Sequence, residues 1–176
     1  MCQAVHEKGA RVAVHSAVAW ATEYVRAGVD SIEHGPALTP DALTEMAQRG
    51  IAWVPTLTTV AGIGEYLSTA DVPPSLQDQA RDSLRNIRAL LPVAERLGVT
   101  IMAGTDEHPN DFAGEVCKLH DYGLSTRAAL RAASDTGRAF LGLPAWQEGA
   151  PANVVLFDND PRERLGVLGK PVAVLA

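Results

Sequence analysis

Short β-rich runs alternate with longer helix-patterned runs along most of the chain, and this order limits the possible folds. The β-rich runs lie at residues 11–15, 30–35, 51–57 and 99–106, and apolar residues at helical spacing follow each of them. Because each helix returns the chain to the same end of a sheet, the four strands are expected to run parallel. The pattern predicts an α/β fold built from about four βα units.

Capping residues mark the ends of several predicted helices. Thr39 is a favourable N-cap, and Pro40 suits the first helical position. Residues 58–74 contain Gly, Thr and Pro and are predicted to form a long connection, after which Ser75 begins a helix that runs to Leu97. Glycines are expected to end three helices, at Gly28, Gly50 and Gly98.

The pattern changes after Gly142. A helical pattern covers residues 125–141, whereas the β-rich runs at 154–157 and 172–175 have no helical pattern between them. We therefore expect a partial barrel domain at residues 1–143 and a partial C-terminal β-segment at residues 144–176.

Composition limits which partners the protein can bind and in which cellular compartment it is expected. The 176 residues are 47% hydrophobic, and 15 basic against 21 acidic residues give a net charge of -6. No Lys/Arg run is present, so nucleic acid and membrane surfaces are not expected partners. Cys2 and Cys117 are far apart in sequence, and no secretory signal follows Met1. We expect free thiols and a cytoplasmic location.

Two architectures use successive βα units. One is an open, doubly wound sheet, and the other is a (β/α)8 barrel, which normally needs about 250 residues. Four units are half of a barrel. If the fold is a barrel, the chain is expected to be a fragment.

Three polar side chains end predicted strands. His15, His34 and Asp106 occupy these positions, and parallel α/β folds bind ligands at the carboxyl ends of their strands. Two imidazoles and a carboxylate suit zinc, with manganese or iron as alternatives. Thr56, at the end of the third run, is a candidate to line a substrate pocket. Glu33 alternates away from His34 and is expected to face the helix layer.

Several motifs carry a family resemblance that covers nearly the whole chain. They are AVHSAVAWATEYVRAGVDSIEHG, VPTL, AGTD, RAALRAASDTGRAFLGL and EGAPANVVLFDNDP. Together they resemble the C-terminal half of a metal-dependent amidohydrolase of the imidazolonepropionase-like and Xaa-Pro dipeptidase-like branch. The resemblance implies the second half of a TIM-like (β/α)8 barrel plus part of a small C-terminal β-subdomain. It also implies hydrolysis of an amide, cyclic amide or dipeptide carbon–nitrogen bond with metal-activated water.

The resemblance assigns roles to individual residues. It implies that His15, His34 and Asp106 are metal ligands at the ends of the fifth, sixth and eighth barrel strands. Asp106 is also expected to shuttle the catalytic proton. Thr56 and His108 are candidate substrate contacts. The most suitable cofactor is Zn²⁺, with Mn²⁺ or Fe²⁺ possible, and the expected substrate is a small-molecule amide.

One part of the family pattern is missing. No His-x-His occurs among the five histidines, and no lysine ends a predicted strand to bridge two metals. We therefore expect a fragment that is inactive alone and that pairs with the missing N-terminal half or with itself. Two alternatives remain open: a non-catalytic half-barrel that needs a partner chain, and an open flavodoxin-like binding module. Metal-dependent amide turnover favours the enzyme, partner-dependent solubility the half-barrel, and phosphate at a helix N-terminus the binding module.

Overall fold

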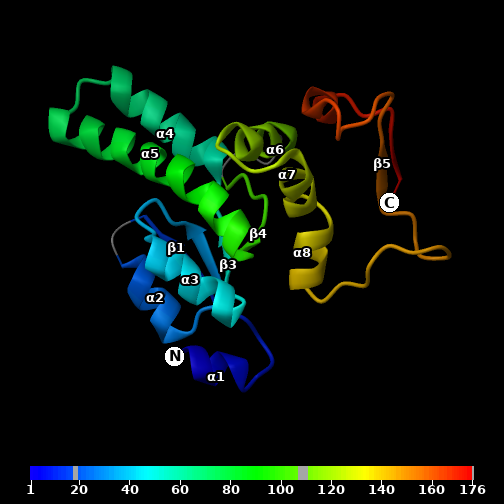
Figure 1. Ribbon diagram of the computed structural model, residues 1–176, viewed down its shortest axis with the longest axis horizontal. Helices are drawn as coiled ribbons and strands as arrows, with labels where there is room; N and C mark the ends of the chain where they lie inside the picture. The colour runs from blue at the N-terminus through cyan, green and yellow to red at the C-terminus, as the bar shows by residue number, and fades with distance from the viewer. Residues whose placement is uncertain (18–19, 107–110, 176) are drawn as a thin grey trace.

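A parallel sheet of four strands organises the N-terminal part of the chain (Figure 1). The computed structural model describes residues 1–17, 20–106 and 111–175. The strands pair in the order β1-β2-β3-β4, and all three pairings are parallel, as predicted. Their bounds are Ala13–Ser16 (β1), Ser31–His34 (β2), Ala52–Val54 (β3) and Thr100–Ile101 (β4). In this described part of the chain, β1 and β4 are therefore the outer strands of the sheet.

One face of the sheet is buried against helices. Ile32, Trp53 and Ile101 are register partners on neighbouring strands, and all three belong to the hydrophobic core. Helices supply the other side of this core, and their bounds are Cys2–His6 (α1), Ala21–Ala27 (α2), Pro40–Arg49 (α3) and Pro74–Leu97 (α5). Burial of these apolar side chains fixes which face of each strand points toward the helices.

The predicted helix boundaries are confirmed where capping chemistry is local. The Thr39 hydroxyl accepts a hydrogen bond from the Ala42 amide at 3.2 Å, and Pro40 is the first residue of α3. Gly28, Gly50 and Gly98 follow α2, α3 and α5 in the left-handed conformation, as expected for helix-ending glycines.

The long connection predicted for residues 58–74 is wrong, because most of it is helical. Helix α4 spans Leu57–Thr69 and packs lengthwise against α5, so that the two form a long antiparallel hairpin (Figure 1). Gly64 lies at this contact, where an added Cβ would meet Leu84 Cδ1 at 2.6 Å. Gly64 therefore does not interrupt α4, and its lack of a side chain allows the two helices to approach closely.

The C-terminal third contains short elements. The predicted helix over residues 125–141 is divided into α7 (Thr126–Ala132) and α8 (Asp135–Phe140), and α6 (Phe112–Asp121) precedes them. Strands β5 (Val154–Leu156) and β6 (Ala173–Leu175) pair antiparallel, as the absence of a helical pattern suggested. Between them lies the 3-10 helix η1 (Leu165–Gly169), whose two leucines, Leu165 and Leu168, pack against the core. The domain boundary near Leu143 stays a prediction.

Of the helices formed by the described residues, none is long and apolar enough to cross a membrane. The longest, α5, has charged residues throughout its length.

Candidate active site

The strand ends do bring the three predicted site residues to one place. His15, His34 and Asp106 all line a pocket of about 330 Å³. His15 lies in β1, His34 ends β2, and Asp106 follows β4 by a few residues. These residues meet because the carboxyl ends of parallel strands lie at the same edge of a sheet.

The two histidines are direct neighbours. Their ring centroids lie 4.5 Å apart, with the planes at 71° in an edge-to-face arrangement. His15 is exposed, whereas His34 is only 8% exposed. Burial lowers the pKa of His34 and the nearby His15 lowers it further, against an opposing effect of Asp106. The site therefore favours a neutral His34, which is the form that binds a metal.

Thr56 sets the tautomer of His34. The Thr56 hydroxyl donates to the Pro55 carbonyl oxygen at 2.8 Å, and its oxygen lies 2.5 Å from His34 Nδ1. A hydroxyl has one proton, and with that proton in the bond to Pro55 the Thr56 oxygen accepts from Nδ1–H of His34. This network assigns the proton of the neutral ring to Nδ1 and leaves a lone pair on Nε2. An imidazole oriented in this way is suited to bind a metal through Nε2.

The backbone at these positions is unusual. His34, Thr56 and Asp106 have φ angles of 65°, 48° and 57°, and they are the non-glycine residues with positive φ in the part of the chain that the structure describes. Such backbone costs about 1–2 kcal/mol per residue for ordinary side chains. All three residues belong to the same small region. Concentrated strain of this kind is typical of functional sites.

Neighbouring elements hold the end of β2 in place. The indole nitrogen of Trp53 donates to the His34 carbonyl oxygen at 2.9 Å. From α5, the Asn86 amide donates to the carbonyl oxygens of Pro36 at 2.9 Å and Leu38 at 3.0 Å. The loop after His34 is therefore fixed by bonds from β3 and α5.

The donor types at this edge fit a divalent ion. Two imidazoles and a carboxylate are the ligands that zinc prefers, together with thiolates. Across residues 1–17, 20–106 and 111–175, no group of three or more His, Cys, Asp and Glu side chains stands close enough to enclose an ion. The chemistry therefore fits, but the three-ligand geometry is not formed. His15, His34 and Asp106 stay predicted ligands.

The α4–α5 hairpin supplies the opposite wall of the pocket, and this wall is mainly apolar. Thr59, Gln79 and Ser83 are its polar members. The apolar contributors include Val60, Ile63, Leu67, Leu76 and Ala80. Sequence reasoning missed these residues as pocket-lining, because it treated the first half of the hairpin as a loop. The unusual length of the predicted connection over residues 58–74 was the one sequence signal that this segment has a function.

Glu33 lies on the face of β2 opposite Ile32. There it lines a second cavity of about 460 Å³ together with residues of α6, α7 and α8. The Ser31 hydroxyl donates to its carboxylate at 2.7 Å. Burial raises the pKa of Glu33, and the negative charge of Asp106 raises it further, against the lowering effect of the Ser31 bond.

Two predicted substrate contacts have different outcomes. Thr56 is buried and does not line the pocket, since its hydroxyl is used by His34 and Pro55. A role in contacting substrate stays a prediction for Thr56. His108 lies outside the described residues. Of the histidines not assigned to the site, His6 pairs with Asp30 at 2.9 Å and His120 bonds the Leu124 carbonyl oxygen at 2.9 Å.

Solved structures with the same fold decide the wider class. An Xaa-Pro dipeptidase with bound methionine in its active site matches 98% of this chain and 45% of its own, with 26% identity and a TM-score of 0.84. An amidohydrolase matches 99% of this chain and 45% of its own, with 24% identity and a TM-score of 0.83. The chain has an amidohydrolase-type fold. The (β/α)8 closure of that fold requires strands beyond the four described here and stays a prediction.

Sequence relatives extend the comparison without adding a function. An uncharacterized protein of Mycobacterium tuberculosis is 34% identical over 176 residues, which cover 97% of this chain. The chain spans about half the length of this relative, at 47%. No protein-family model matches the chain.

Proposed function

We propose that the chain carries part of the active site of a metal-dependent hydrolase that cleaves an amide, cyclic amide or dipeptide carbon–nitrogen bond. One observation carries this proposal: His15, His34 and Asp106 come from three strand ends of an amidohydrolase-type fold and line one pocket. A structural role alone gives no reason for three strained or exposed polar residues to meet at this edge.

The residues have distinct chemical roles in this proposal. His15, His34 and Asp106 would hold the ion, and Nε2 of His34 would be the ligand atom because Nδ1 contacts Thr56. A divalent ion such as zinc supplies Lewis acidity, which polarises the scissile carbonyl and lowers the pKa of the attacking water. Asp106 accepts the proton of the nucleophile and passes it to the leaving nitrogen. Burial lowers the pKa of His34, which favours the neutral ring that a metal requires.

The pocket wall favours an apolar substrate group. Apart from the site residues themselves, its lining carries no charged side chain among the residues that the structure describes. An uncharged side chain next to the scissile bond would bury against Ile63, Leu67 and Leu76, whereas a charged one would lose hydration without gaining a partner. The methionine bound in the active site of the similar Xaa-Pro dipeptidase supports this preference.

Zinc titration of chelator-treated chain tests the metal site. We expect one ion per chain, and His34→Ala should weaken binding by at least about tenfold. His120→Ala is the matched control, because this histidine bonds only the Leu124 carbonyl and should leave zinc affinity unchanged. Equal loss in the two variants, or no loss in either, would contradict the proposed ligand set.

Dipeptide binding tests the substrate class separately. Zinc-loaded chain should bind methionyl-proline more tightly than lysyl-proline in a calorimetric titration, by about tenfold or more, because the lysine charge has no partner in the pocket. Equal affinity for the two dipeptides would contradict the proposed apolar subsite. Loss of both affinities in Ile63→Lys, with zinc binding intact, would locate the dipeptide on the hairpin.

The outer strands support a second proposal, that activity needs a pairing polypeptide. β1 and β4 end the described sheet, and exposed residues such as Ala13 lie on β1. Unpaired strand edges favour association. We expect self-association by light scattering and little turnover of N-acyl amino acids, dipeptides or cyclic amides by the chain alone. A monomeric, cooperatively folded chain with high turnover would contradict this proposal.

A further inference from the structure

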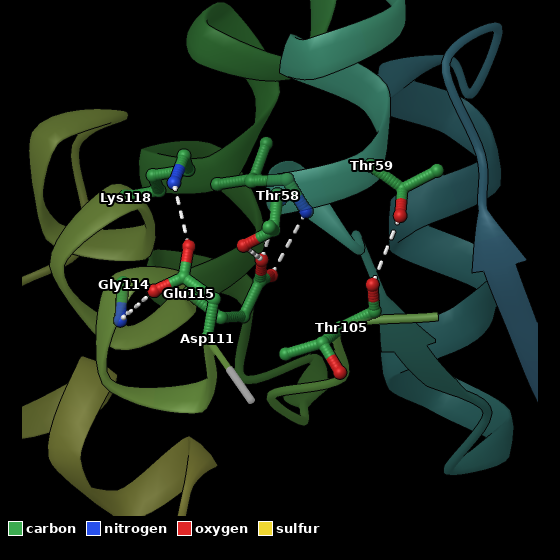
Figure 2. A network of polar contacts seen from close by, with 8 residues as sticks. Thr58, Thr59, Thr105, Asp111, Gly114, Glu115 and Lys118 are labelled. Carbon is green, nitrogen blue, oxygen red and sulfur yellow. Dashed lines mark hydrogen bonds and ion pairs between the residues drawn. The ribbon is translucent and has the colours of Figure 1, made fainter. Parts of the chain in front are cut away.

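A buried carboxylate joins α6 to the first turn of α4. Glu115 is fully buried, at 0% exposure. Its Oε1 accepts from the Leu57 amide at 2.9 Å, and its Oε2 accepts from the Thr58 amide at 2.7 Å and from the Thr58 hydroxyl at 2.8 Å (Figure 2). These partners are 57 and 58 residues away in sequence.

Among the described residues, no cation forms an ion pair with Glu115, although the charge of Lys118 lowers the pKa of this carboxyl. Lys118 lies one turn along α6, but its ammonium group pairs with Asp111 at 3.5 Å (Figure 2). Burial raises the pKa of Glu115, and the bonds from Thr58 and Leu57 oppose that effect. The carboxylate is stabilised mainly by amide dipoles at the positive end of α4. Glu115 therefore caps the N-terminus of α4.

The residue that would normally cap α4 is occupied elsewhere. Thr56 is the N-cap residue, and its side chain makes no capping hydrogen bond. Its single hydroxyl proton goes to Pro55, and its oxygen accepts from His34. Free amides at a helix N-terminus need acceptors. Glu115 supplies those acceptors from another helix, so the Thr56 hydroxyl remains available to His34.

A second bond ties the same turn to the Asp106 segment. The Thr59 hydroxyl donates to the Thr105 carbonyl oxygen at 2.9 Å (Figure 2). The first turn of α4 thus contacts Glu115 on one side and the residue before Asp106 on the other. Movement of this turn would shift Thr56 and the residue preceding Asp106 together.

We propose that Glu115 is a positioning residue for the active site: by capping α4 from α6, it holds Thr56 in the geometry that fixes the tautomer of His34. The catalytic consequence rests on the proposed function, whereas the effect on His34 does not. Glu115 lies outside the pocket and contacts no substrate. Its influence passes through the backbone of Leu57 and Thr58 to the hydroxyl of Thr56.

The test is the tautomer of His34 in Glu115→Gln, measured without metal from the ring nitrogen signals in an NMR spectrum at pH 8. Glutamine keeps one acceptor oxygen and places an NH2 group against the remaining amide, which leaves that donor unpaired. In the wild-type chain, we expect Nδ1–H to dominate. In Glu115→Gln, the signals should move toward a mixture of tautomers, and zinc affinity should fall by about tenfold.

A matched control exists in the same chain. Glu95 also bonds the start of another helix, since its carboxylate accepts from the amide at 2.9 Å and from the hydroxyl at 2.5 Å of Ser125, the N-cap residue of α7. Glu95→Gln should therefore lower stability without changing the His34 signals. A His34 tautomer that is unchanged in folded Glu115→Gln, or equally changed in Glu95→Gln, overturns the proposal.

A milder variant keeps the test decisive if Glu115→Gln does not fold. Glu115→Asp retains the charge but shortens the side chain by one methylene, so it should shift the His34 tautomer in the same direction by a smaller amount. An unshifted tautomer in folded Glu115→Asp also counts against the proposal. Because the readout needs neither metal nor substrate, failure to bind zinc would refute the proposed function and leave this result standing.

Discussion

The two ends of the sheet use left-handed backbone for different purposes. At the end where helices lead into strands, Gly28, Gly50 and Gly98 adopt φ angles of 80°, 70° and 77°. An added Cβ at any of these glycines would have no atom within 4 Å. Space is therefore available, and glycine is favoured there by backbone conformation alone.

At the opposite end, where strands lead into loops and helices, Gly35 is also left-handed (φ 62°), but three other left-handed residues carry side chains. His34, Thr56 and Asp106 have φ angles of 65°, 48° and 57°. Glycine would relieve the strain at each position. The side chains that replace it line the pocket or hold a residue that does. We infer that this end of the sheet keeps residues with strained backbone because their side chains line or support the pocket.

The strongest expected effect comes from Asp106→Gly, which makes the carboxyl end resemble the other end. Zinc affinity should fall by about a hundredfold or more, because a ligand is removed. The free energy of unfolding should change by less than about 0.5 kcal/mol, since relief of the left-handed strain offsets the added freedom of the unfolded chain. Calorimetric zinc titration and urea unfolding measure the two quantities. Unchanged zinc affinity would remove Asp106 from the site.

The reverse experiment is Gly50→Ala, which places a side chain at the glycine end. It should lower the free energy of unfolding by about 1–2 kcal/mol through strain, with zinc affinity unchanged. Gly62→Ala is the matched control, because Gly62 lies within α4 with space for a Cβ and without positive φ. The free energy of unfolding of Gly62→Ala should rise by about 0.5–1 kcal/mol. Equal changes in the free energy of urea unfolding for the two substitutions would contradict the claim that left-handed backbone requires glycine at position 50.

A smaller effect concerns how α4 begins at the carboxyl end. Burial raises the pKa of Glu115 above its ordinary value of 4.5, against bonds from Thr58 and Leu57 and the charge of Lys118. Between the pKa of the unfolded state and that of the folded state, the folded chain therefore binds a proton that the unfolded chain releases. The contribution of Glu115 to stability is greatest below pH 4.5 and is lost as pH rises through the folded-state pKa.

Paired unfolding curves measure this pH dependence. The free energy of unfolding of the wild-type chain minus that of Glu115→Gln should increase as pH is lowered from 7.5 toward 4.5. A difference that decreases on acidification would show that hydrogen bonding outweighs burial in setting the pKa of Glu115.

Local chemistry explains what the sequence could predict. The parallel pairing and the capping of α3 by Thr39 follow from hydrophobic period and from contacts a few residues apart. The convergence of His15, His34 and Asp106 follows from strand ends in a parallel sheet. Each of these features depends on short-range signals or on a general property of βα units.

Long-range contacts explain what it could not. Helix α4 lacks a local cap and contains two glycines, so its start depends on Glu115, 58 residues away from Leu57. The burial of Ile32 in the core places Glu33 on the other face of β2. The positive φ of His34 then turns its side chain out of strict alternation. None of these effects has a signal within a short sequence window.

Anomalous diffraction at the zinc absorption edge, from crystals of the zinc-soaked chain, is the most direct test of the site. We predict one strong peak in the pocket, within bonding distance of His34 Nε2 and next to the His15 ring and the Asp106 carboxylate. The Nδ1 atom of His34 should remain bonded to Thr56. A peak only at another pair, such as His6 and Asp30, or no peak in the pocket at saturating zinc, would contradict the assignment of this edge as a metal site.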